Sequence, residues 1–106
     1  MKNEIYHNGI LIEVQDKRTL EQAKQSNIEY KRELTSQILS SAGLDTSTQQ
    51  NAALGIYEPA RCEAIKNYIA ACRNEYLRCK GLILAATTNE MADSVQFIAP
   101  SVPENL

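Results

Sequence analysis

Three cysteines and a single histidine are the side chains of this sequence with the most reactive chemistry. Cys62, Cys72 and Cys79 lie in one segment, with Cys72 and Cys79 seven residues apart. On a helix that spacing separates the two Cα atoms by about 10.5 Å, whereas a disulfide requires less than about 7 Å. An odd cysteine count without a Cys-x-x-Cys motif predicts free thiols, packed as small hydrophobic groups in a reducing compartment. An intermolecular disulfide or a redox switch stays open if these residues lie on a symmetry axis.

A zinc site or an activated thiol would require His7 to reach one of these cysteines. His7 belongs to a predicted N-terminal hairpin, and the sequence has no Gly-rich turn between a strand and a helix to form an oxyanion hole. The four glycines are isolated, which argues against a phosphate-binding loop. We therefore expect no enzymatic activity, no metal site and no cofactor.

A basic stripe runs beside the cysteines, because Lys66, Arg73 and Lys80 recur every seven residues. Such a stripe either contacts phosphates of a nucleic acid or pairs with acidic residues of a facing helix. The candidate acidic partners are Glu21, Glu29 and Glu33. The chain carries 11 Lys and Arg against 13 Asp and Glu, whereas a nucleic-acid-binding domain usually has a basic excess. We therefore expect protein rather than nucleic acid as the partner.

The cysteines and the basic stripe both require a long second helix, predicted over residues 59–86. Pro59 suits a first helical turn, and the apolar residues after it alternate at spacings of three and four, the a/d pattern of packed helices. This apolar seam consists of Cys62, Ile65, Ile69, Cys72, Tyr76, Cys79 and Ile83. We expect it to pack on the first helix and to leave apolar surface for another chain. The residues expected at these contacts are Ile65, Ile69, Cys72, Tyr76 and Cys79.

The facing helix is predicted over residues 19–42. Thr19 and Gln22 fit a capping box at its start, and Gly43 fits its end. Its predicted apolar face comprises Leu20, Ala23, Tyr30, Leu34, Ile38 and Ala42. The opposite face, which includes Lys31, is predicted to be solvated.

The N-terminal residues 1–15 are predicted to form a β-hairpin around Asn8 and Gly9, a pair typical of a type I′ turn. Ile10, Ile12 and Val14 would share one face of its second strand. Two isolated strands are marginal in water. The hairpin is therefore expected to pack on the helices or to pair with a strand of another chain, and these three residues are candidate contacts.

The whole chain is expected to be mainly α, as one domain over residues 1–99. The N-terminal hairpin is followed by two long antiparallel helices and a short C-terminal helix at 88–97, capped by Thr87 or Thr88. A short turn near 48–54 lies between the long helices. Pro100 and Pro103 predict a loose tail over 100–106. No segment approaches the ~20 apolar residues that span a bilayer, so no membrane partner is expected.

Two segments of the C-terminal third, residues 68–78 (YIAACRNEYLR) and residues 83–91 (ILAATTNEM), carry a family resemblance. The first resembles the Tyr-Arg-x-x-Leu helix of small tail-accessory and tail-fibre-assembly proteins of tailed bacteriophages. The second is similar to the Ile-x-Ala-Ala-Thr-Thr-x-Glu-Glu-Leu segment of the same proteins. The tail from Pro100 to Pro103 is also similar to the C-terminal end of these proteins. The Trp-Pro pair that the assembly proteins have near their C-terminus is absent. The resemblance implies a virion or tail accessory role without catalytic residues.

These patterns together predict a non-enzymatic structural subunit that binds other protein chains, as a homo-oligomer or within a larger virion assembly. Its expected location is the bacterial host cytoplasm during assembly, and its presence in the mature virion stays an open alternative. The alternative is a small regulatory protein that binds nucleic acid or a host protein through Lys66, Arg73 and Lys80.

Overall fold

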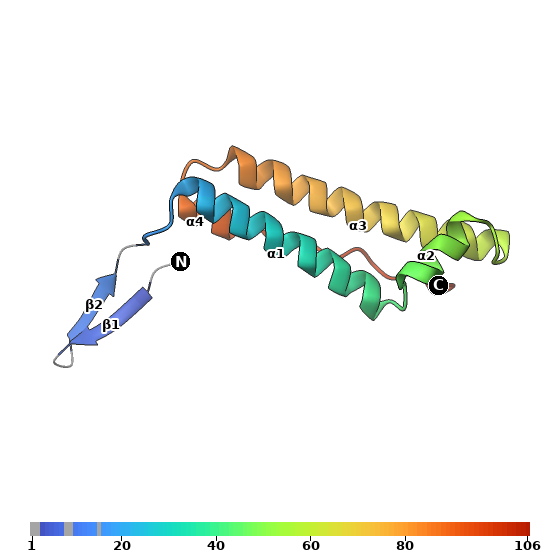
Figure 1. The fold of residues 1–106 in the computed structure, drawn as a ribbon, viewed down its shortest axis with the longest axis horizontal. Coiled ribbons are helices and arrows are strands. Elements are labelled where there is room, and N and C mark those ends of the chain that lie inside the picture. Colours follow the sequence, from blue (N-terminus) through green and yellow to red (C-terminus); the bar gives the residue numbers. More distant parts are fainter. Residues whose placement is uncertain (1–2, 8–9, 15) are drawn as a thin grey trace.

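The computed structural model describes the backbone of residues 3–7, 10–14 and 16–106, and the side chains of residues 16–106. The chain is mainly helical, as predicted. Its described helices are α1 (Leu20–Ser41), α2 (Thr46–Ala53), α3 (Pro59–Ala85) and α4 (Asn89–Ser94). The long helices α1 and α3 lie side by side and run antiparallel, while α2 packs on the first half of α3 (Figure 1).

The helix ends follow from local side-chain chemistry. Thr19 and Gln22 form the predicted capping box, in which the Thr19 hydroxyl accepts from the Gln22 amide and the Gln22 side chain accepts from the Thr19 amide. Gly43 follows α1 with φ of +81°, a left-handed conformation that costs glycine little. Asp45 caps α2 by accepting from the Thr48 amide. These caps fix where α1 ends and α2 begins.

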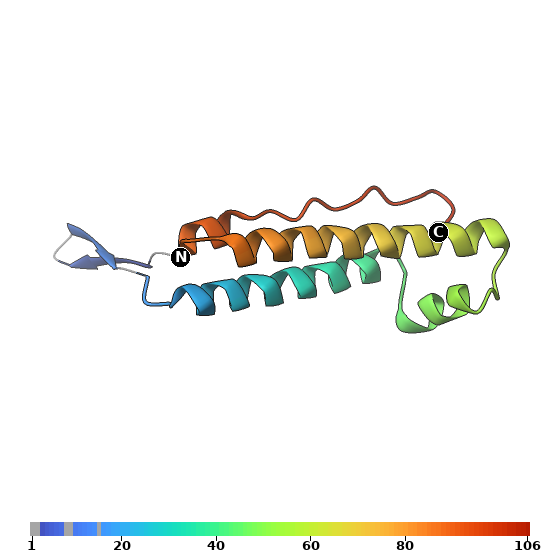
Figure 2. The same ribbon diagram turned by 90° about the horizontal axis from the view of Figure 1, so that it is seen from above.

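Helix α3 continues through Gly81 and ends at Ala85. Helix α4 begins at Asn89 and is capped by Thr88, whose hydroxyl accepts a hydrogen bond from the Met91 backbone amide. Helix α4 ends at Ser94, three residues before the predicted boundary at 97. Residues 95–106 then run back in extended form along α3 (Figure 2).

The last residues differ from the loose tail that the prolines predict. Leu106 packs against the core cluster around Ile65, and the Asn105 side chain lies 3.5 Å from the Ala60 carbonyl oxygen at the start of α3. A pair of helices leaves much apolar surface uncovered, and an extended segment with apolar residues can cover part of it. Pro100 and Pro103 therefore do not release the last residues of the chain from the core.

Among residues 16–106, two clusters of buried side chains lie along α3. Ile65, Tyr68 and Cys72 pack with Leu44 and Ala52 where α2 meets α3. At the other end Ile83, Ala86 and Ala92 pack together, with Ile28 of α1 and Val95 partly buried against them. Apart from Tyr68, the core side chains in these clusters are small or aliphatic, in a chain with 6% aromatic residues.

The face that α1 turns to α3 differs from the prediction at two positions. Tyr30 is 59% exposed, whereas Lys31, assigned to the solvated face, is only 6% exposed. The four-carbon stem of a lysine can lie along apolar surface while its ammonium reaches a polar or aromatic group. The Lys31 ammonium lies 5.1 Å from the centre of the Tyr30 ring. Tyr30 is therefore exposed where burial was predicted, and Lys31 is buried where exposure was predicted.

The strands β1 (Asn3–His7) and β2 (Ile10–Val14) pair antiparallel, with Ile5 opposite Ile12. The predicted turn at Asn8 and Gly9 lies outside the described residues. So do the side chains of Ile10, Ile12 and Val14, and their contacts stay a prediction.

Candidate interaction surface

The apolar seam lies mostly inside the chain. Ile65, Cys72 and Cys79 are fully buried, and Ile69 and Tyr76 are half-buried. The buried members contact the chain's own α1, α2 and C-terminal segment. In this conformation only the edge of the seam, at Ile69 and Tyr76, is open to a partner.

The three thiols are free and buried. Burial raises the pKa of Cys72 and of Cys79 above the ordinary thiol value, because desolvation disfavours the thiolate. The Cys79 thiol donates to the Gln96 carbonyl oxygen at 3.4 Å, and the Cys62 thiol donates to the Tyr57 carbonyl oxygen at 3.3 Å. Their surroundings are those of packing residues rather than of reactive nucleophiles.

The basic stripe is solvent-accessible along α3. Lys66 and Arg73 are exposed and Lys80 is half-buried. Within residues 16–106, none of the three forms an ion pair with Glu21, Glu29 or Glu33. The stripe therefore borders the helix pair without holding it together.

The two faces of the α1–α3 pair differ in what covers them. Helix α4 and residues 95–106 lie over one face in both views (Figures 1 and 2). The other face carries a groove, which we call the open groove. It is lined by Leu20, Glu21, Lys24, Gln25, Ile28, Glu29, Arg32 and Leu84. Sequence periodicity did not single out this surface, because most of its residues are polar positions of α1.

Two contacts across the open groove fix the register of α1 against α3. The Lys24 ammonium donates to the Leu84 carbonyl oxygen at 2.7 Å, and the Arg32 guanidinium lies 3.5 Å from the Tyr76 hydroxyl. Arg32 also pairs with Glu29 on its own helix at 2.6 Å. Leu84 is 54% exposed at the rim, so the groove offers apolar surface between charged side chains.

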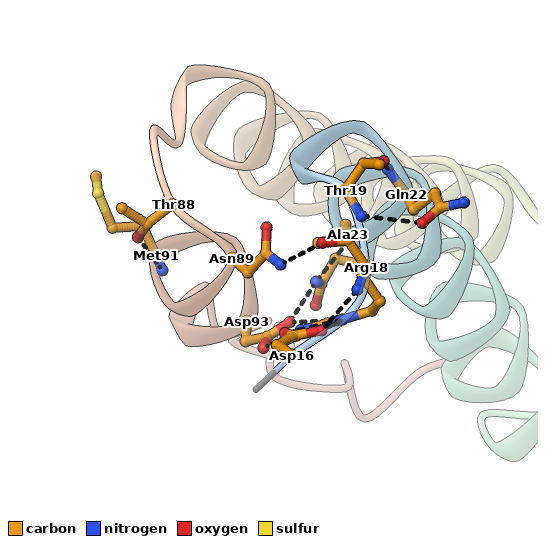
Figure 3. A network of polar contacts seen from close by, with 10 residues as sticks. Asp16, Arg18, Thr19, Gln22, Ala23, Thr88, Asn89, Met91 and Asp93 are labelled. Carbon is orange, nitrogen blue, oxygen red and sulfur yellow. Dashed lines mark hydrogen bonds and ion pairs between the residues drawn. The ribbon is translucent and has the colours of Figure 1, made fainter. Parts of the chain in front are cut away.

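A polar network ties α4 to the start of α1 (Figure 3). Arg18 donates to Asp93 at 2.8 and 3.1 Å, and it also pairs with Asp16. The side-chain amide of Asn27 donates to the Asp93 carboxylate at 2.8 Å, and the side-chain amide of Asn89 donates to the Arg18 backbone carbonyl oxygen at 3.0 Å. Bonds from one guanidinium to two carboxylates are charge-assisted and strongly directional. The network therefore fixes α4 on the face opposite the open groove.

The Arg18 hydrogen bonds hold the pKa values of Asp16 and Asp93 well below the ordinary aspartate range. A lowered carboxylate pKa contributes stability that is fully present above the unfolded-state pKa, about 3.9 for Asp. That contribution is lost as the pH falls from there toward the folded-state pKa.

Arg18→Gln should therefore make the melting temperature depend less steeply on pH in the acid range. We expect the melting temperature of the parent to fall steeply between about pH 4 and pH 2, and that of the variant to start lower and fall less. Melts followed by circular dichroism across this range would measure it. Lys17→Gln removes the same charge from the exposed neighbouring residue and should leave the parent slope. Parallel curves for parent and Arg18→Gln would exclude this role for the network.

The described part of the chain holds no cluster of three His, Cys, Asp or Glu side chains arranged for a metal ion. None of its described helices has both the length and the apolar character needed to cross a membrane. No protein-family model, no curated protein and no solved structure matches the chain.

Proposed function

We propose that this protein is a non-enzymatic structural subunit that binds other protein chains through the helix pair α1–α3. The observation that carries the proposal is the open groove on a thin two-helix body. Among its lining residues, Ile28 is partly exposed and Leu84 is largely exposed. Exposed apolar surface rimmed by charges is typical of protein contacts. Its companion on α3, the half-buried edge at Ile69 and Tyr76, extends this surface along the helix.

The assembly to which it belongs is a bacteriophage tail or virion, as a component or an assembly factor. This narrower proposal rests on the resemblance of residues 68–78 and 83–91 to tail-accessory helices. The protein would act in the host cytoplasm during assembly, where buried free thiols such as Cys72 persist.

Particle composition tests this function. Tail and virion intermediates purified from producing bacterial cells should contain the chain in a fixed ratio to the major tail protein, measured by quantitative mass spectrometry. Leu84→Glu should reduce that ratio, and Leu82→Glu, on the same helix and similarly exposed at 49%, should not. Absence of the chain from every particle and intermediate would overturn the phage assignment.

The second candidate function is regulatory binding of nucleic acid through Lys66, Arg73 and Lys80, favoured by the exposure of this stripe without ion pairs in the described residues. Three phosphate contacts would make affinity fall about 30- to 50-fold between 50 and 200 mM salt, because counterions are released on binding. A fluorescence titration with duplex DNA measures this. Absence of binding at the lower salt concentration would remove this candidate.

A further inference from the structure

We infer that the occupant of the open groove is a second copy of this chain, packed so that the two α1 helices run antiparallel about a two-fold axis. The inference rests on the proposed function and names the partner at this surface. The first observation is the pattern of the groove residues on α1: Glu21, Gln25, Ile28 and Arg32 are spaced by four, three and four residues. This spacing places them along one stripe of the helix.

The stripe is complementary to itself when the second copy is antiparallel. A two-fold axis that crosses α1 midway between Ser26 and Asn27 brings each Glu21 level with Arg32 of the other copy. The same operation brings Gln25 level with Ile28 in the middle. An isologous interface requires this property, since residue i must contact residue j and j must contact i. The two ends of the stripe carry opposite charges, so the antiparallel pairing creates two attractive contacts between Glu21 of one copy and Arg32 of the other.

The charges at the ends of the stripe are available for this pairing. Glu21 forms no ion pair within the described residues. Arg32 forms an ion pair with Glu29, where both side chains are more than half exposed, and its guanidinium also lies 3.5 Å from the Tyr76 hydroxyl. Such an exposed pair is weak and can exchange partners at little cost. Leu20 of α1 and Leu84 of α3, which also line the groove, would supply apolar contact beside the stripe.

The two faces of the α1–α3 pair are not equally accessible to a second copy (Figure 2). The face opposite the open groove is already occupied by α4 and residues 95–106 (Figure 2). The open groove is therefore the face on which the second copy fits.

Charge reversal tests the pairing on the full chain. Sedimentation equilibrium of the parent should show a monomer–dimer equilibrium. Glu21→Lys turns two attractive contacts into repulsive ones and should weaken the dimer by roughly tenfold, and Arg32→Glu should do the same. The double variant Glu21→Lys with Arg32→Glu restores opposite charges in the reverse sense and should recover most of the parent affinity. Glu33→Lys, the same change on the solvated side of α1, is the matched control and should dimerise as the parent does.

Thermal melts of the dilute monomers would show that the variants fold, so that a weakened dimer is not a loss of structure. A parent that stays monomeric at every concentration would overturn the inference, and particle incorporation would then still decide the proposed function. Failure of the double variant to recover affinity would overturn the antiparallel α1 pairing. A monomeric parent whose particle incorporation is lost in Glu21→Lys would assign the groove to a different protein, which also overturns it.

Discussion

Ile65→Asp should prevent the helical body from folding. Ile65 is fully buried where α2 meets α3, among Leu44, Ala52 and Cys72. The substitution places a carboxylate in an apolar cluster, a change that costs several kcal/mol. Small domains have total stabilities of about 5–15 kcal/mol, and this thin core makes the lower end the relevant one. We expect loss of the helical circular-dichroism signal, or a melting transition too weak to fit.

Two comparison variants keep this prediction testable if the aspartate variant yields no folded protein. Ile56→Asp makes the same change at a residue that is 63% exposed and should melt within about 0.5 kcal/mol of the parent. Ile65→Val should fold and lose about 0.5–1.5 kcal/mol in urea denaturation. A parent-like melt for Ile65→Asp would show that this cluster does not hold α2 and α3 together.

The helix pair could be predicted because its signals are local. Thr19 and Gln22 lie within one turn, and Gly43 needs only its own backbone conformation to end α1. The apolar spacing in residues 62–83 reports burial directly, since a helix brings such residues to one face. Because these signals lie within one helical turn, the predicted bounds of the first helix, 19–42, differ little from the observed α1, Leu20–Ser41.

The contacts that position α4 and the C-terminal segment could not be predicted in the same way. Arg18 and Asp93 are 75 residues apart, and nothing near either residue in sequence marks the other as its partner. The exchange of roles between Tyr30 and Lys31 depends on how α1 is rotated against α3, which a periodic pattern fixes only to within about one residue. Both features arise from tertiary packing.

The position of the open groove has the same origin. The seam predicted leftover apolar surface next to α3 without showing on which side it would lie. The side is decided by α4 and residues 95–106, which cover one face and leave Leu84 exposed at the edge of the other. From the sequence alone, Glu21 and Arg32 are interpreted as ordinary solvated residues. Their role as candidate contacts depends on knowing which face of the helix pair is open. The candidate interface is therefore a consequence of the C-terminal segment as much as of the helices.

Removal of residues 95–106 should uncover Cys79. The Gln96 carbonyl oxygen accepts hydrogen bonds from the Cys79 thiol and from Arg78, at 3.4 and 2.7 Å, and the Ile98 amide donates to Glu75 at 2.7 Å. Without these contacts the thiol gains access to solvent, and its pKa, which burial raises, should fall toward the ordinary value. Both changes increase the rate of alkylation, which depends on the accessible thiolate.

We expect Cys79 to react at least about tenfold faster in the truncated chain than in the full chain, because local opening of a covered site limits the rate in the latter. Cys72 is the internal control, since it is equally buried and lies in the cluster with Leu44 and Ala52. Peptide mass spectrometry after brief alkylation separates the two positions in one sample. Equal acceleration at both cysteines would indicate that the truncation loosens the whole helix pair. Unchanged labelling of Cys79 would mean that residues 95–106 do not cover α3, and the asymmetry between its two faces would then disappear.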